Sequence, residues 1–184
     1  MPETNGISAL SAFDGGSVVN VVVEASKGSR IKLKYDETTG VFRAEKVLPV
    51  GLVFPFDFGF IPSTLAPDGD PVDAIILSEM GLPPTIVVLA RVLRILKCKQ
   101  TENGRSERND RIVVLPLDAK SRKPMQPAVQ FDAMLEEAIS RFFVEYNKLQ
   151  GKAFRVLDID GAREAVDAIR KSVTMNGNRG SLRG

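Results

Sequence analysis

The sequence contains no histidine and only one cysteine, Cys98. The absence of histidine excludes a Ser-His-Asp triad, a Cys-His pair, an imidazole general base and a zinc site with histidine ligands. A single cysteine cannot form an internal disulfide or a cysteine zinc site, and this scarcity is typical of the reducing cytoplasm. Any catalysis must therefore rely on carboxylates, Lys, Arg, Tyr, Ser, Thr or a metal held by oxygen ligands.

Long hydrophobic runs and a strong charge of one sign are also missing. No apolar run reaches the ~20 residues that a membrane-spanning helix needs, and residues 1–16 lack the basic start and apolar core of a secretory signal. The net charge of +2 is too small to indicate a nucleic-acid partner by itself. The 184 residues, 43% hydrophobic and 26% charged, predict a single globular domain over 17–175, with flexible tails at 1–16 and 176–184.

Short strands dominate the chain, and helices come late. Apolar spacing of 3.6 residues predicts a helix from Met134 with Asp132 as its N-cap, and a last helix capped by Asp160. Residues 97–110 are polar and charged, which predicts a loop. Because strands precede helices instead of alternating with them, the order indicates an α+β fold on an antiparallel sheet or small barrel. The predicted strands are 18–24, 31–35, 42–48, 72–77, 85–96, 111–115 and 153–160.

Three carboxylates, Asp68, Asp70 and Asp73, share the short segment D-G-D-P-V-D. Its glycine and proline favour a tight turn that would bring the carboxylates together. Close carboxylates repel one another unless a cation or protons intervene, and oxygen ligands favour Mg²⁺, Mn²⁺ or Ca²⁺. A plain surface turn is the alternative, although Asp73 lies in an apolar strand, where Asp is rare without a partner. An EF-hand fits poorly, because Val72 would fill a ligand position.

Further segments between residues 18 and 170 accompany this motif. They are Ile31-Lys32, Tyr35-Asp36, Gly40, Phe54-Pro55, Phe58-Gly59-Phe60-Ile61-Pro62, Thr64-Leu65 and Phe142-Phe143-x-x-Tyr146. Together with D-G-D-P-V-D they resemble the first family of soluble inorganic pyrophosphatases. The resemblance implies an OB-like five-stranded antiparallel β-barrel with flanking C-terminal helices. It also implies hydrolysis of inorganic pyrophosphate to two phosphates with Mg²⁺, or Mn²⁺ in its place, in a cytoplasmic homo-oligomer such as a hexamer.

The resemblance also implies roles for the residues at matching positions. Asp68, Asp70 and Asp73 correspond to metal ligands, and Asp70 also to the base that acts on the attacking hydroxide. Glu24 and, more weakly, Asn109 correspond to further positions of the metal site. The positions that correspond to phosphate-binding groups are Lys32, Lys46, Arg111 and Tyr146. Two of these carry a changed residue, since the family has Arg at the place of Lys46 and Lys at that of Arg111.

The chain departs from the family at several other positions. Lys34 stands where the family has an acidic residue, and Gln100 and Asn109 stand where it has Asp, so the metal cradle is less negative. Neutral oxygens hold Mg²⁺ less well than carboxylates do. Further changes remove two Tyr hydroxyls and one Lys, at Phe54, Phe58 and Asn147. An acid of the 97–110 loop could compensate for the losses: Glu102, Glu107 or, less readily, Asp110.

These departures leave three functions open. The first is hydrolysis of pyrophosphate, slow or altered by the replacements. The second is a catalytically inactive pyrophosphatase-like protein that binds a phosphate ligand or acts in an assembly. The third and least supported is a nucleic-acid binder, because OB-like barrels bind single strands through aromatic faces and a basic groove. Its support is the basic residues Lys97, Lys99, Arg105, Arg108, Arg111, Arg179 and Arg183.

Overall fold

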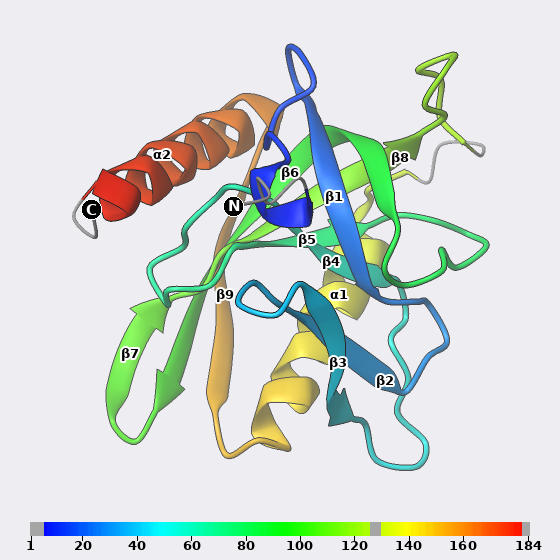
Figure 1. Cartoon of the computed structure of the whole chain (residues 1–184). Coiled ribbons are helices and arrows are strands. Elements are labelled where there is room, and N and C mark those ends of the chain that lie inside the picture. Colours follow the sequence, from blue (N-terminus) through cyan, green and yellow to red (C-terminus); the bar gives the residue numbers. More distant parts are fainter. Residues whose placement is uncertain (1–5, 126–129, 182–184) are drawn as a thin grey trace.

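The computed structural model describes residues 6–125 and 130–181 (Figure 1). A short 3₁₀ turn, η1 (Ile7–Ala9), precedes the strands, and the helices are α1 (Ala133–Lys148) and α2 (Ala162–Ser181). The strands are β1 (Val18–Ala25), β2 (Ile31–Asp36), β3 (Val41–Val47), β4 (Asp57–Ile61), β5 (Val72–Ile76), β6 (Val87–Glu102), β7 (Arg105–Arg108), β8 (Arg111–Leu117) and β9 (Ala153–Asp160). None of the helices in these residues is both long and apolar enough to cross a membrane.

Five strands close into a barrel. β1 pairs with β4, β4 with β5, β5 with β8, β8 with β6, and β6 again with β1. Four of the five pairings are antiparallel, whereas β5 and β8 run parallel. The predicted OB-like α+β barrel is therefore confirmed, with one parallel pair that the prediction did not contain. β6 is 16 residues long, so it also pairs with β7 and β9 beyond the barrel.

Two apolar clusters hold the layers together. Alternate residues of β1, including Val19, Val21 and Val23, enter one cluster inside the barrel. Helix α2, at the upper left of Figure 1, packs its buried Ile169 against this cluster. Helix α1 covers a second cluster, rich in phenylalanine, through the face that includes Phe143. The stripe that predicted α1 is thus its buried face, and Asp132 caps the helix by accepting a hydrogen bond from Leu135 N–H at 2.9 Å.

The prediction of a loop over residues 97–110 is wrong. β6 extends through it to Glu102 and returns as β7, paired from Lys99 opposite Arg108 to Glu102 opposite Arg105. The two linking residues, Asn103 and Gly104, have φ values of +50° and +76°. Asn-Gly with positive φ at both positions is the preferred two-residue turn of a hairpin, so this sequence signal was present locally.

Regular structure is present near both ends of the described chain, in η1 and in α2. Residues 176–181 continue α2, and part of the N-terminal segment is fixed to the barrel, where buried Ala12 O accepts a hydrogen bond from Asn20 N–H at 2.9 Å. The flexible tails at 1–16 and 176–184 stay a prediction, and residues 1–5 and 182–184 lie outside the described part. Asp160 was also predicted wrongly as a cap: it ends β9 and forms an ion pair with Lys97.

Candidate active site

The segment with three carboxylates forms the tight turn that its sequence predicts. Gly69 has a φ of +88°, a conformation that glycine adopts without strain. Ala66 N–H donates to Asp70 O over 2.8 Å, and Asp70 N–H donates to Asp68 Oδ1 over 3.2 Å. Asp73 follows within β5, where it pairs with β4 on one side and with the first residue of β8 on the other. The barrel therefore fixes Asp73, while the turn presents the other two carboxylates.

A lysine between two glutamates lies beside this turn. Lys32 of β2 places its Nζ 3.6 Å from Glu24 Oε2 of β1 and 3.4 Å from Glu45 Oε2 of β3. Burial raises the pKa of Glu24 to about 7, even though Lys32 lowers it. Burial opposes the charge of Lys32, but the surrounding carboxylates, Glu24 foremost, outweigh burial and hold the pKa of Lys32 above its usual value. Lys32 is therefore a permanent cation, and its side chain is 16% exposed.

Arg111, the first residue of β8, is a second cation of the site and is buried. Its Nη2 lies 3.5 Å from Asp73 Oδ2, and its Nη1 donates to Asn109 O at 2.8 Å. The guanidinium lies over two rings, 4.2 Å from the centroid of Phe143 and 4.6 Å from that of Phe154. Burial raises the pKa of Asp73, and Arg111 opposes that rise. Cation–π contacts and the ion pair together fix the guanidinium in one position.

Lys46 and Tyr146 meet across 100 residues of sequence. Lys46 of β3 donates to Tyr146 Oη of α1 at 3.3 Å and to Gln150 Oε1 at 2.6 Å. Burial lowers the pKa of Lys46 and raises that of Tyr146. Helix α1 thus contributes to the site a hydroxyl that stays protonated at neutral pH.

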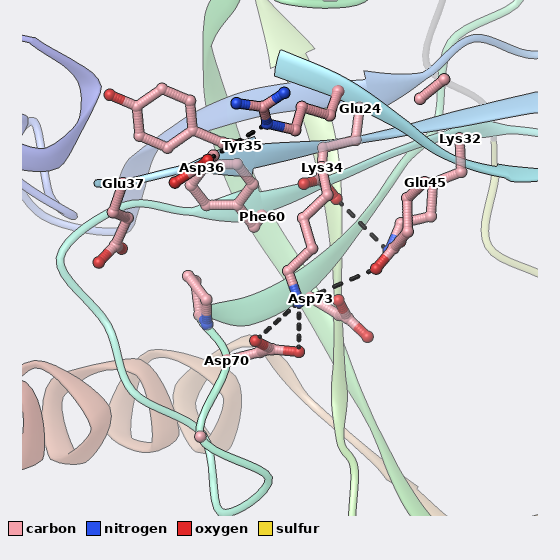
Figure 2. A pocket seen from close by; sticks show the side chains of 14 residues that line it. Glu24, Lys32, Lys34, Tyr35, Asp36, Glu37, Glu45, Phe60, Asp70 and Asp73 are labelled. Atoms are coloured by element: carbon pink, nitrogen blue, oxygen red, sulfur yellow. Dashed lines mark hydrogen bonds and ion pairs between the residues drawn. The ribbon is translucent and has the colours of Figure 1, made fainter. Parts of the chain in front are cut away.

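These groups surround one cavity of about 260 Å³. Nearly all the residues predicted for the site line this cavity: Lys32, Lys46, Asp68, Asp70, Asp73, Asn109, Arg111 and Tyr146. Glu24 instead lines an adjoining cavity of about 580 Å³, which shares Lys32, Glu45, Asp70 and Asp73 with the first (Figure 2). Phe54 and Phe58 also line the smaller cavity, as rings without a hydroxyl. Residues far apart in sequence therefore converge on a single polar centre.

The carboxylates of this centre fit a divalent cation only in part. Among the described residues, no group of three acidic or cysteine side chains is arranged to hold a metal. Figure 2 shows why Asp70 does not serve: Lys34 Nζ lies 3.1 Å and 3.2 Å from its two oxygens and 3.9 Å from Glu45 Oε1. The Asp68 and Asp73 oxygens are hard donors of the kind that Mg²⁺ prefers. Asp68 and Asp73 both line the cavity, and an ammonium lies at Asp70.

The two amide residues that stand where the family has Asp also line the cavity. Gln100 and Asn109 both line it, and Asn109 Nδ2 donates to Gln100 Oε1 at 3.2 Å. Of the three acids considered as replacements, only Glu107 lines the cavity, while Glu102 and Asp110 form ion pairs elsewhere. The β6–β7 hairpin that sequence reasoning missed is what brings Glu107 to this position.

Glu45 is a site residue that sequence reasoning missed, because the strand pattern hides it. Lys32 pairs with Lys46, but the next residue, Leu33, pairs with Ala44, so Glu45 is an extra residue in β3. Such a β-bulge breaks the alternation of side chains between the two faces. Glu45 and Lys46 therefore both line the 260 Å³ cavity although they are adjacent in the chain.

Comparison with known proteins agrees with this geometry. The family model described as inorganic pyrophosphatase matches residues 21–176. The chain belongs to the inorganic pyrophosphatase family. The soluble inorganic pyrophosphatase of Oryza sativa subsp. indica is 30% identical over 161 residues, which are 88% of this chain and 73% of the relative. The inorganic pyrophosphatase of Thermus thermophilus is 31% identical over 154 residues, 84% of this chain and 86% of the relative.

Solved structures of inorganic pyrophosphatases share the fold. The enzyme of Neisseria gonorrhoeae superposes with a TM-score of 0.80 at 28% identity, over 93% of this chain and 98% of the other. The enzyme of Thermus thermophilus gives a TM-score of 0.76 at 29% identity, over 94% and 99%. Membership of the inorganic pyrophosphatase family confirms the resemblance and the class of enzyme that it implied.

Proposed function

We propose that this protein hydrolyses inorganic pyrophosphate to two phosphates in the 260 Å³ cavity. The observation that carries the proposal is the convergence of Lys32, Lys46 and Arg111, from three strands, on the cavity that Asp68 and Asp73 line. Pyrophosphate is a compact polyanion, and such a ring of cations is the complement that it requires. The names of the relatives point to the same substrate.

The cations would bind and orient the substrate. Arg111 is fixed between two aromatic rings, so it can bind phosphate oxygens without reorganising during the reaction. Its buried Nε–H has no hydrogen-bond partner among the described residues. Lys32 of β2 would neutralise the same charge, and Tyr146 Oη–H would donate a hydrogen bond to a phosphate oxygen.

Hydrolysis adds water across the phosphoanhydride. The water oxygen forms a bond to one phosphorus, the bridging P–O bond breaks, and the leaving phosphate takes the electron pair. Asp70 would accept the proton of the attacking water once Lys34 releases one of its oxygens. A Mg²⁺ ion held by Asp68 and Asp73, more weakly helped by Asn109, would neutralise phosphate oxygens and acidify water when bound.

Phosphate release from pyrophosphate by the purified protein, with Mg²⁺ and then Mn²⁺, tests the proposal. We expect turnover within ~1–10³ s⁻¹ for the wild type. Asp70→Asn should lower it at least ~100-fold, the contribution of a general base. Asp167→Asn, an exposed change on α2, is the matched control and should leave turnover unchanged. Release no faster than that of Asp70→Asn with either metal would overturn the proposal.

A non-catalytic phosphate binder is the second candidate, which the contact of Lys34 with both oxygens of Asp70 favours. It would show a melting temperature raised by pyrophosphate without phosphate release.

The nucleic-acid alternative loses support, because Lys97 is paired with Asp160 and Arg108 with Asp110. The homo-oligomer and the cytoplasmic location stay predictions, which sedimentation and cell fractionation would test.

A further inference from the structure

A lysine ammonium lies at the point where the two cavities meet. Lys34 Nζ is 3.1 Å and 3.2 Å from the two oxygens of Asp70, and 3.9 Å from Glu45 Oε1. Asp70 and Glu45 line both cavities, so the ammonium contacts carboxylates that face the substrate side as well (Figure 2). This two-oxygen contact is the coordination that a metal ion would otherwise take at Asp70.

The contact does not follow from burial. The side chains of Lys34 and Asp70 are 45% and 57% exposed, so each could point into water. Partial burial lowers the pKa of Lys34, but the hydrogen bond to Asp70 and the charges of Asp70 and Glu45 together outweigh burial and raise it. The three groups come from separate elements, β2, the turn before β5, and the bulge of β3. Residues from three separate elements therefore meet at the ammonium.

Neighbouring carboxylates are balanced in the same way. Glu24 pairs with Lys32, and Asp73 pairs with Arg111. Asp68 is the one carboxylate of the D-G-D-P-V-D turn that forms no ion pair among the described residues. A divalent cation that approached Asp70 would meet the like charge of Lys34 within a few ångströms, which repels it strongly in a partly buried site. Only displacement of the ammonium would give it both oxygens.

We propose that the Lys34 ammonium acts as a tethered substitute for one divalent cation in this site. It neutralises Asp70 and Glu45, excludes a metal from Asp70, and contributes positive charge to the binding of a phosphate ligand. The inference deepens the proposed function and rests on it for the identity of that ligand, pyrophosphate. The protein then needs fewer metal ions to bind its ligand than its carboxylates alone would demand.

Mn²⁺ binding to the full chain without pyrophosphate tests the metal side, with free Mn²⁺ measured by electron paramagnetic resonance. Lys34→Gln should bind Mn²⁺ at least about tenfold more tightly than the wild type, because the repelling charge is gone. Lys34→Glu should bind about one further Mn²⁺ per chain. Adding Asp70→Asn to Lys34→Gln should abolish the gain. Lys120→Gln, an exposed lysine after β8, is the matched control and should equal the wild type.

Pyrophosphate binding in EDTA, by calorimetry, tests the ligand side. The wild type should bind at least about tenfold more tightly than Lys34→Gln, and Lys120→Gln should match the wild type. Mn²⁺ binding unchanged in both Lys34 variants would overturn the inference, as would equal pyrophosphate affinity in EDTA. A gain in Mn²⁺ binding with no detectable pyrophosphate binding by the wild type or any variant, in EDTA or with Mg²⁺, would instead refute the proposed function and leave Lys34 as the group that excludes the metal.

Discussion

Glu24 makes the stability of the protein depend on pH. Its side chain is 5% exposed, and burial raises its pKa from 4.5 to about 7. Between these two values the native state keeps a proton that the unfolded chain has released. The free energy of unfolding is therefore higher below about pH 4.5, and the contribution of Glu24 falls as the pH rises towards 7.

Glu24→Gln removes this ionisation while keeping the shape of the side chain. Each unit of pKa difference corresponds to about 1.4 kcal/mol. The rise from 4.5 to about 7 therefore predicts that the variant gains up to about 3 kcal/mol over the wild type between pH 4.5 and pH 8. Lys32 keeps Glu45 at 3.4 Å, so the substitution does not leave its ammonium without a carboxylate.

Urea unfolding in EDTA, at intervals from pH 5 to pH 8.5, measures this difference. The raised pKa values of Asp57 and Asp68 affect wild type and variant alike, so they cancel in the comparison. Glu136→Gln, an exposed change in the first turn of α1, is the control and should show no such trend. Parallel pH profiles for Glu24→Gln and the wild type would refute the reasoning.

Three further substitutions test the fold and the site. Gly59→Ala would place a Cβ 1.9 Å from Val22 O and should cost roughly 3 kcal/mol of unfolding free energy, measured in urea. Asp132→Ala removes the cap of α1 and should cost about 1 kcal/mol in the same assay. Arg111→Met removes the cation beside Asp73 and should weaken pyrophosphate binding at least about tenfold by calorimetry, with partial recovery in Arg111→Lys.

Local pattern was enough for much of the fold, and its failures have physical causes. The β2–β3 hairpin and α1 follow from alternation and from a 3.6-residue stripe. β4 gave no such signal, because all five of its residues are buried and it therefore lacks alternation. The parallel pairing of β5 with β8 joins residues about 40 positions apart, and no local preference encodes it. The Asn103-Gly104 turn, in contrast, has a clear local sequence signal, and the prediction of a loop there overlooked it.

The site residues also separate into those that local sequence predicts and those that depend on the three-dimensional fold. The three carboxylates were predictable because a turn motif brings them together within six residues. The convergence of Lys46 with Tyr146 came only from the resemblance, since 100 residues separate them. Glu45 was not predictable, because a bulge reverses the face that alternation assigns to it. The contact of Lys34 with Asp70 depends on how β2 and the turn before β5 meet in space, which no residue pattern specifies.

The solvent exposure of an ion pair determines whether a substitution that removes its cation changes only ligand binding or also the stability of the protein. Asp70 is 57% exposed, so removing Lys34 leaves a carboxylate that water can solvate, and the variant should fold. Asp73 is only 22% exposed and its partner Arg111 4%, so removing that cation leaves a charge largely without water. Substitutions at Lys34 therefore measure the affinity of the site for metal and ligand, whereas substitutions at Arg111 also measure the cost of an unpaired carboxylate. A pyrophosphate effect of Arg111→Met must accordingly be corrected for lost stability, and one of Lys34→Gln need not be.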